Sequence, residues 1–516
     1  MSARMAAMQP QHPYFKGVTL ALVTISLALG TFMEVLDTTI ANVAIPHIAG
    51  DLGVSPTQAT WVITSYAIAN AISMLLSGWL AQRFGQVRVF VGAVLLFTLA
   101  SWLCGMAVSF GMLLAFRVMQ GGVSGLMVPL SQTLLLSNYP AEKRGIALAI
   151  WAMTVVVAPV VGPIAGGWLT DNIGWPWIFY INIPVGLLAA LLTWRLLAER
   201  DTPTRRVPVD VVGLALIVIW VGALQIMLDK GSELDWFGSI YIITLAVVAA
   251  LGLALFVVWE LTEENPIVDL RLFKVRNLTA GAIALSLGYG LYIGNIVLLP
   301  LWLQTQMGYT ATWAGLVLAP SGVLAFLFSP AVGKNLTRVD PRLFATAALL
   351  VFALSSFWRA GFTAEASYMQ LALPQLVIGI GVAMFFTPLF SIAAGNLPPD
   401  KAALGSGLTN FLRITAGSFG TSLATTFWER REAVHHTQLV EHVTAFTPQA
   451  GDVMNQLGDM GLSSGQILAR INHVLTQQTS LLAANDIFWI SGWIFALLVV
   501  SVWFARKPFG ATPAGH

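Results

Sequence analysis

Long apolar runs separated by short polar segments are the main pattern along the chain. The runs reach about 20 residues, the length at which an α-helix crosses the ~30 Å hydrocarbon core of a bilayer. The pattern predicts fourteen helices in groups of six, two and six, and hence an all-α polytopic membrane protein. The predicted ranges are 18–45, 57–80, 89–108, 110–136, 145–168 and 178–197, then 209–229 and 239–262, then 277–303, 311–332, 342–361, 368–393, 402–428 and 486–505.

Composition supports a surface that faces lipid. Of the 516 residues, 57% are hydrophobic and 10% are charged, whereas soluble domains carry about 25% charged residues. A soluble protein of this length would still need a charged surface, so the composition excludes that class. The single cysteine, Cys104, excludes an intramolecular disulfide and is interpreted as a small packing residue.

Lysines and arginines are distributed unevenly between the two sides of the predicted helices. Nineteen of the 26 fall on the side that holds both termini. Two, Arg117 and Arg413, fall inside helices, and the other side has only Lys230, Arg359, Arg430, Arg431 and Arg470. Segments rich in Lys and Arg stay in the cytoplasm, so we expect both termini to be cytoplasmic.

Two segments far apart in the sequence match each other. "SNYPAEKRG" (137–145) aligns with "GNLPPDKAA" (395–403) at an offset of 258 residues, and the same offset aligns 121–125 with 379–383. Repeated halves with a site at their interface are typical of transporters. We therefore predict an N-terminal six-helix half (1–200), an inserted two-helix segment (201–264) and a C-terminal six-helix half (265–516). The C-terminal half contains a long loop at 429–485.

Three charged side chains lie in the middle of the first and fourth predicted helices. Glu34 and Asp37 share one face of the first helix, and Arg117 lies in the fourth, on the same face as Gln120. A charge at mid-bilayer costs about 2.5–3.5 kcal/mol. These groups must therefore face a wet cavity, pair with one another or be neutral part of the time. Proton transport and a structural salt bridge between the two helices both satisfy that requirement.

Four further motifs follow the first helix. They are "GWLAQRFGQVR" (78–88), "LLAFRVMQGG" (113–122), "APVVGPIAGG" (158–167) and "WPWIFYINIPVG" (175–186). Their glycines permit tight turns and close helix packing. The tryptophans and tyrosine of the last motif favour the membrane interface.

Together with "LDTTIANVAIP" (36–46), these motifs resemble the major facilitator superfamily, and within it the fourteen-helix drug:proton antiporter family of EmrB-type multidrug efflux pumps. The resemblance covers the whole chain and implies the major facilitator fold with two pseudo-symmetric six-helix halves. Two positions depart from the family pattern. Gln82 stands where the loop motif usually has an acidic residue, and Ala158 replaces the first glycine of the antiporter motif.

The resemblance also implies roles for individual residues. Asp37 is expected to carry the proton, with Arg117 as its partner. Glu34 is not fixed by the motif, and its role is open between a second proton site, an anchor for cationic substrates and a bystander. The antiporter motif comprises Gly162, Pro163, Gly166 and Gly167, and the cytoplasmic loop motif comprises Gly78, Arg83, Gly85 and Arg88. Polar, aromatic or sulfur-containing side chains in mid-helix are candidates for the substrate cavity: Gln120, Trp151, Met153, Tyr289, Tyr292, Asn295, Phe385, Asn410 and Arg413.

The implied function is export of hydrophobic drugs and toxic compounds across the bacterial inner membrane in exchange for protons. We expect no metal or other cofactor and no nucleic-acid partner. Pumps of this type work with a periplasmic adaptor (membrane fusion) protein and an outer-membrane channel. The loop 429–485 is a candidate docking surface for the adaptor, and a tolerated surface insertion is the alternative.

Other functions account for part of the same pattern. A proton-coupled exporter or symporter of one metabolite, such as a siderophore or amino acid, would have the same architecture. The sequence contains no Walker loop, HExxH motif or soluble catalytic domain, so we expect neither an enzyme nor an ATP-driven pump. A channel would not need the repeated halves or the acids within the membrane.

Overall fold

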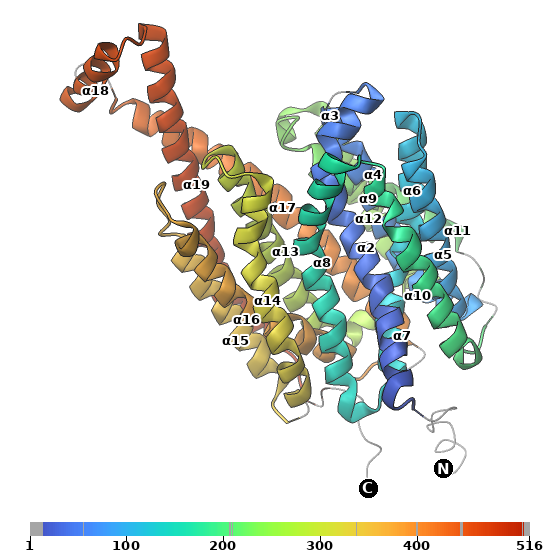
Figure 1. Cartoon of the computed structure of the whole chain (residues 1–516). Helices are drawn as coiled ribbons and strands as arrows, with labels where there is room; N and C mark the ends of the chain where they lie inside the picture. The colour runs from blue at the N-terminus through green and yellow to red at the C-terminus, as the bar shows by residue number, and fades with distance from the viewer. Residues whose placement is uncertain are drawn as a thin grey trace.

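The computed structural model describes residues 14–54, 56–205, 208, 210–336, 338–398, 401–443, 447–507 and 509. Within these residues all regular structure is helical (Figure 1). The N-terminal half contains α2 (Gly17–Leu52), α3 (Pro56–Ala59), α4 (Trp61–Phe84), α5 (Gln86–Gly105), α6 (Phe110–Ser124), α7 (Met127–Asn138), α8 (Arg144–Asn172), α9 (Trp177–Tyr180) and α10 (Asn182–Leu197). The next two long helices are α11 (Val211–Lys230) and α12 (Ile240–Thr262). The C-terminal half contains α13 (Arg276–Thr305), α14 (Ala311–Asn335), α15 (Pro341–Arg359), α16 (Tyr368–Ala394), α17 (Ala402–Val440), α18 (Pro448–Asp459) and α19 (Ser464–Val502).

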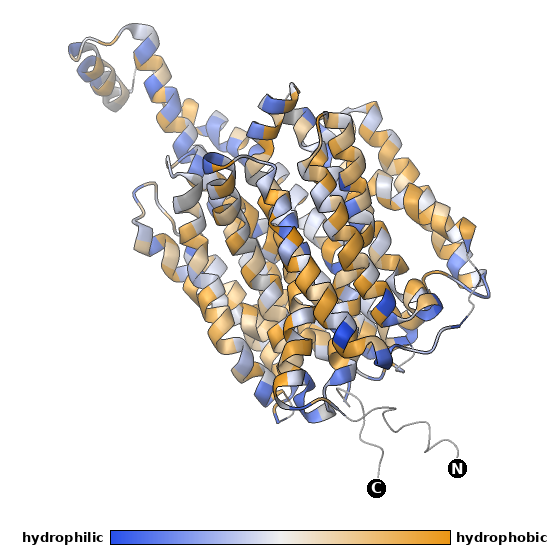
Figure 2. Cartoon of the chain, turned by 45° about the vertical axis from the view of Figure 1, so that its right-hand side comes forward, coloured by the Kyte–Doolittle hydropathy of each residue, from blue (hydrophilic) through white to orange (hydrophobic). Residues whose placement is uncertain are grey.

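The outer surface of the bundle is apolar. Figure 2 shows hydrophobic residues along the length of the helices and hydrophilic residues gathered toward both ends of the bundle. Twelve helical segments among the described residues are long and apolar enough to cross a membrane. Two more long helices, α8 with 29 residues and α17 with 39, pack against neighbours in the same bundle. The chain is thus a multi-pass membrane protein. The count of fourteen spans is compatible with the structure and stays a prediction.

The two halves meet along α4, α7 and α8 of the N-terminal half and α14, α16 and α17 of the C-terminal half. α8 packs against α2 of its own half and against α14 of the other, while α17 packs against α13 and also against α4. The inserted pair lies at this seam, because α11 contacts α4, α12 and α17. Trp220 of α11 packs edge-on against Phe411 of α17, with ring centroids 5.8 Å apart.

The predicted span 110–136 is confirmed as one candidate span, Phe110–Asn138, but a short turn divides it into two helices. α6 ends at Ser124 and α7 begins at Met127. Gly125 lies between them, where an added Cβ would collide with the carbonyl oxygen of Asn70 on α4. Pro129 also has no backbone N–H to donate to the turn before it. Close packing and the proline together account for the break.

The segment 429–485 differs from the predicted loop because much of it is helical. α17 continues to Val440, α18 follows, and α19 begins at Ser464. Ser463 and Gln466 form a capping box that starts α19. The extended ends of α17 and α19 project with α18 beyond the rest of the bundle (Figures 1 and 2). Asp486 of α19 holds them together by pairing with Arg431 at 2.5 Å and contacting His435 at 2.9 Å.

The halves contact each other closely at one end of the bundle. We call this the terminal end, because α2 begins there and α19 ends there (Figure 1). An added Cβ on Gly145 of α8 would collide with the carbonyl oxygen of Gly333 of α14. Likewise, an added Cβ on Gly78 of α4 would lie 2.8 Å from Cα of Leu404 on α17. Backbones this close hold the terminal end shut.

Candidate functional site

The charged pair predicted from the sequence exists in the N-terminal half. Arg117 Nη1 of α6 lies 2.5 Å from Asp37 Oδ2 of α2, and neither side chain is exposed to solvent by more than 1%. Asp37 Oδ1 accepts two more hydrogen bonds, from Gln120 Nε2 and Asn182 Nδ2, both at 3.1 Å. The carboxylate is therefore paired and also hydrogen-bonded, as a buried charge requires.

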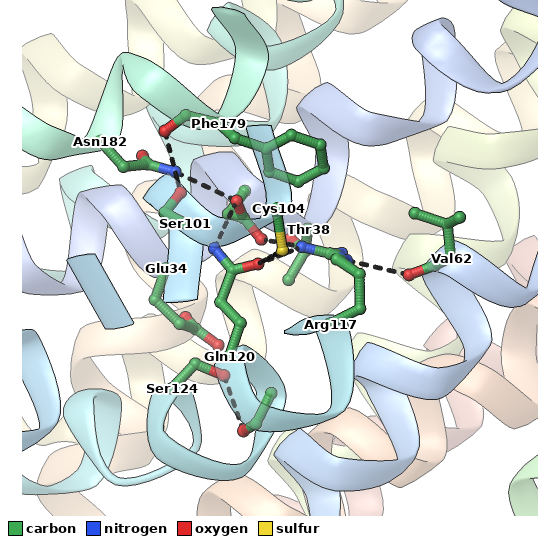
Figure 3. A network of polar contacts seen from close by, with 12 residues as sticks. Glu34, Thr38, Val62, Ser101, Cys104, Arg117, Gln120, Ser124, Phe179 and Asn182 are labelled. Atoms are coloured by element: carbon green, nitrogen blue, oxygen red, sulfur yellow. Dashed lines mark hydrogen bonds and ion pairs between the residues drawn. The ribbon is translucent and has the colours of Figure 1, made fainter. Parts of the chain in front are cut away.

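Arg117 is also held by α4 and α9 and by Gln120 of its own helix. Its Nε donates to the carbonyl oxygen of Val62 at 2.9 Å, and its Nη1 also donates to Gln120 Oε1 at 2.8 Å. The guanidinium lies over the ring of Tyr66, 4.1 Å from its centroid, with Phe179 on a further side. Figure 3 shows Arg117 and Gln120 of α6 beside Val62 of α4 and Phe179 of α9. The cation can therefore stay in place if the charge on Asp37 changes.

Asn182 extends the network to two more helices. Its Nδ2 also donates to Ser101 Oγ of α5 at 3.0 Å, and Ser101 in turn donates to the carbonyl oxygen of Phe179 at 2.9 Å. Cys104 Sγ, which the sequence left as a packing residue, donates to Gln120 Oε1 at 3.6 Å. Sequence reasoning missed Asn182 and Ser101. The only indication in the sequence was the amide of Asn182 inside the apolar stretch 178–190. That stretch was interpreted only as a segment at the membrane interface.

Glu34 lies one turn before Asp37 and makes separate contacts. Its Oε1 accepts from Asn70 Nδ2 at 2.9 Å, and Asn70 also donates to Ser124 Oγ at 2.7 Å. Glu34 is 1% exposed, and no described basic group lies within 4 Å of it. Arg413 of α17 is near enough for its charge to act on Glu34 across the interface between the halves. The two acids are thus in different environments, although they share a helix face.

Several candidate cavity residues lie where the halves meet. Trp151 of α8 donates to Ser131 Oγ at 3.1 Å and packs edge-on against Phe390 of α16. Arg413 donates to Asn410 Oδ1 at 3.3 Å and lies 4.6 Å from the ring centroid of Tyr289.

A glutamine that the sequence did not reveal also joins the halves here. Gln132 Oε1 of α7 accepts from Asn410 Nδ2 at 3.2 Å and from Ser406 Oγ at 2.5 Å. Both partners belong to α17, so the polar contact crosses the interface.

The remaining candidates lie elsewhere. Gln120 belongs to the Asp37 network, and Met153 is partly exposed on α8. Tyr292, Asn295 and Phe385 are buried inside the C-terminal half, where Tyr292 stacks on Phe352. The structure thus separates the nine candidates into different regions, and their contact with substrate stays a prediction.

The antiporter motif packs α8 against α2. An added Cβ on Gly162 would collide with Thr39 Oγ1 and lie 3.0 Å from Thr39 Cβ, so a larger residue here would force Thr39 to move. Gly166 is buried, whereas nothing lies within 4 Å of an added Cβ on Gly167. The backbone of Pro163 lies in α8, but its side chain falls outside the described residues.

The loop motif ends α4 and starts α5. Gly85 caps α4 with a φ of 94°, a conformation that favours glycine. Asp201 accepts hydrogen bonds from the backbone N–H groups of Val87 and Arg88, and its Oδ2 lies 3.6 Å from Arg88 Nε. Arg83 stacks on Trp79 at 5.3 Å. A carboxylate therefore stands beside this loop, although Gln82 replaces the usual acid.

A helical bundle of paired halves with a buried carboxylate–guanidinium pair has the form of a secondary transporter. The sequence model of the Major Facilitator Superfamily matches residues 27–421. The chain belongs to this superfamily of transporters. It is 51% identical to the multidrug export protein EmrB of Haemophilus influenzae, over 96% of this chain and 98% of that protein. It is 50% identical to the fatty acid resistance protein FarB of Neisseria gonorrhoeae, over 98% of this chain and 100% of that protein.

Solved structures agree on the fold. The human organic anion transporter MFSD10 superposes with a TM-score of 0.62 at 13% identity, covering 94% of this chain and 100% of that one. The proton:xylose symporter XylE superposes with a TM-score of 0.59 at 15% identity, covering 95% and 96%. At such identities the likeness concerns the fold alone.

Proposed function

We propose that this transporter exports hydrophobic compounds in exchange for protons, and that Asp37 is the proton carrier. The observation that carries the proposal is the fully buried pair of Asp37 and Arg117. A buried carboxylate can change its charge by binding a proton, whereas a guanidinium cannot lose its charge. The names of the similar EmrB and FarB proteins support drugs and fatty acids as the class of substrate.

Protonation of Asp37 would remove the charge that balances Arg117. The guanidinium would keep its hydrogen bonds to Val62 and Gln120, but its attraction to α2 would weaken. α2 packs against α8, and α8 contacts α14 of the other half. A change in the pair can therefore alter the interface between the halves, which is how such folds alternate access. The membrane potential adds about 2.3 kcal/mol per charge per 100 mV.

A transport assay in proteoliposomes tests the exchange. With an imposed pH gradient, we expect the purified protein to move several unrelated hydrophobic dyes against their concentration gradients, in the direction opposite to protons. Collapse of the gradient with a protonophore should stop the movement. Transport of dyes that ignores the gradient would contradict the proposal. Movement of a single metabolite, with no response to the dyes, would instead establish the metabolite transporter.

We further propose that the protein works in a bacterial inner membrane with cytoplasmic termini, and that a periplasmic adaptor docks on the projecting segment. The bias of Lys and Arg toward the side of the termini supports the orientation. The support for docking is a paired helical extension outside the apolar bundle, whose helix α18 has a strongly amphipathic sequence. An outer-membrane channel would complete the export path.

Trimming the extension tests the docking proposal. Residues 437–471 can be replaced by about four Gly/Ser residues, because His436 and Asn472 contact each other at 3.2 Å across the cut. The contact of Arg431 with Asp486 stays in place. We expect the trimmed protein to retain proton-driven transport in proteoliposomes and to lose the ability to protect cells from drugs. Full protection of cells by the trimmed protein would contradict docking at this segment.

A further inference from the structure

Arg359 is a buried cation in the C-terminal half that has no acidic partner. The sequence pattern placed it near the end of the predicted helix 342–361, on the side away from the termini, and the structure buries it at the end of α15, with 2% exposure. No carboxylate lies within 4 Å of it in the described part of the chain, and the ionisable group facing it is Tyr292. Arg117, equally buried in the other half, is paired with Asp37. An unpaired buried charge is strongly unfavourable, so this arginine needs a counter-ion.

The hydrogen bonds of Arg359 leave donors unused. Its Nη2 donates to Asn295 Oδ1 at 3.3 Å and to Ser356 Oγ at 3.4 Å, both long contacts. Its Nε is buried without any partner. The guanidinium lies 4.6 Å from the ring centroid of Phe488, which supplies no full charge. Because a guanidinium has five donors and keeps its proton, the site can still bind an anion.

The internal repeat identifies the residue that occupies the position of the Asp37 carboxylate in the C-terminal half. The offset of 258 residues puts Asn295 at the position of Asp37 and Arg359 at the position of Ser101. It also puts Gln375 at the position of Arg117, and the Nε2 of Gln375 is buried without a partner. The C-terminal half thus keeps a polar cluster at the place of the Asp37 network. Its arginine comes from a different helix, and an amide replaces the carboxylate.

A small cavity adjoins Arg359. It lies between α13, α15, α16 and α19, and its walls include Asn295, Tyr292, Phe352 and Phe495. Its volume is about 10 Å³, roughly what one water molecule needs, whereas drug-sized ligands occupy pockets of about 300–1,000 Å³. The size and the aromatic walls do not fit a drug-sized substrate. An ion somewhat larger than water fits beside Arg359 only if the surrounding side chains shift slightly.

We propose that this cavity binds a monovalent inorganic anion of the size of chloride as the permanent counter-ion of Arg359. The ion occupies the role that the Asp37 carboxylate has in the N-terminal half. Because a halide does not bind protons at neutral pH, the C-terminal half keeps a fixed charge balance while the N-terminal half exchanges protons. The proposal concerns binding and stability and does not depend on the proposed transport function.

Thermal unfolding of the purified full-length protein tests the site. The midpoint is measured in detergent with sodium chloride, sodium bromide or sodium gluconate at equal ionic strength. We expect the midpoint to be about 2–4 °C higher in chloride and bromide than in gluconate, with a dependence on halide concentration that saturates. Equal midpoints in the three salts would overturn the proposal, since the cavity would then hold only water.

Two variants tie the effect to this arginine. Asn295→Asp supplies the missing carboxylate beside Arg359 Nη2, so we expect its midpoint in gluconate to match that of the parent protein in chloride, with no further gain from chloride. Arg359→Gln removes the charge and should also abolish the halide effect. If Arg359→Gln does not fold, Asn295→Asp still decides the matter.

The matched control is Arg431→Gln, which removes an arginine that already has a carboxylate partner in Asp486. We expect this variant to keep the full response to chloride. A halide effect that persists in Asn295→Asp would place the anion elsewhere and overturn the proposal.

In a bromide-soaked crystal, an anomalous peak beside Arg359 would support the proposal directly, and a peak only at other sites would contradict it.

Discussion

Replacing Asp37 with asparagine should reduce proton-driven transport to the background of empty vesicles. The amide keeps the shape of the side chain and can still accept hydrogen bonds from Arg117, but it cannot bind and release a proton. Substrate-dependent proton release by the detergent-solubilised protein should disappear in the same variant. The substitution replaces one carboxylate oxygen with an NH2 group, so both measurements examine the charge of residue 37 rather than its volume.

Loss of stability must be separated from loss of coupling. Asp37→Asn leaves Arg117 buried without its counter-ion, and breaking a buried pair costs about 3–5 kcal/mol. The double variant Asp37→Asn/Arg117→Met removes both charges, so we expect it to regain most of the unfolding free energy without regaining transport. Arg117→Met alone should be as unstable as Asp37→Asn, because it leaves the Asp37 carboxylate buried without its positively charged partner. Proton release that survives in Asp37→Asn would refute the carrier role.

The sequence was enough to predict an all-helical membrane protein of the major facilitator fold and to select Asp37 and Arg117 as partners. The count of fourteen spans and the bounds of the halves stay predictions. Apolar runs of bilayer length leave few alternatives to helices. Two opposite charges in neighbouring transmembrane helices have few ways to avoid the cost of burial except by pairing. The same reasoning did not identify Asn182 or Ser101. Placing a neutral polar side chain in the membrane costs little free energy, so its presence in an apolar run does not by itself indicate a functional site.

Predictions of boundaries failed where tertiary contacts decide the local structure. The break between α6 and α7 depends on Gly125 packing against α4. The sequence of residues 110–136 does not predict that contact. The extension of α17 to Val440 is polar, so a search for apolar runs ends it early. Arg359 lies near the end of the predicted helix 342–361, and nothing in the sequence indicated that its side chain is buried. Its burial depends on Asn295 and Phe488, which lie 64 and 129 positions away in the chain.

Replacing Gly333 with leucine should stop transport by preventing closure of the terminal end. An added Cβ there would lie 2.5 Å from the carbonyl oxygen of Gly145 and 2.8 Å from Cβ of Ala149. All three residues lie where α8 and α14 of opposite halves touch, so each half can still fold. Overpacking of this kind costs about 1–3 kcal/mol, which shifts an equilibrium between two states roughly 5- to 150-fold. The terminal end should therefore stay open, and the unfolding midpoint should hardly change.

A disulfide on another part of the interface reports whether the end is closed. In a Cys104→Ala background, Gln132→Cys and Ser406→Cys place two thiols where side chains of α7 and α17 now form a hydrogen bond. We expect the thiols to cross-link readily in the parent and much more slowly with Gly333→Leu. Gly92→Leu is the control, because nothing lies within 4 Å of an added Cβ at that position. Gly92→Leu should leave the rate of cross-linking in the two-cysteine protein unchanged. In the protein without the introduced cysteines, it should leave transport unchanged.

If Gly333→Leu cross-links and transports like the parent, the contact between α8 and α14 does not have to open and close during transport. If it cross-links slowly and fails to transport, closure of the terminal end is a required step of the cycle.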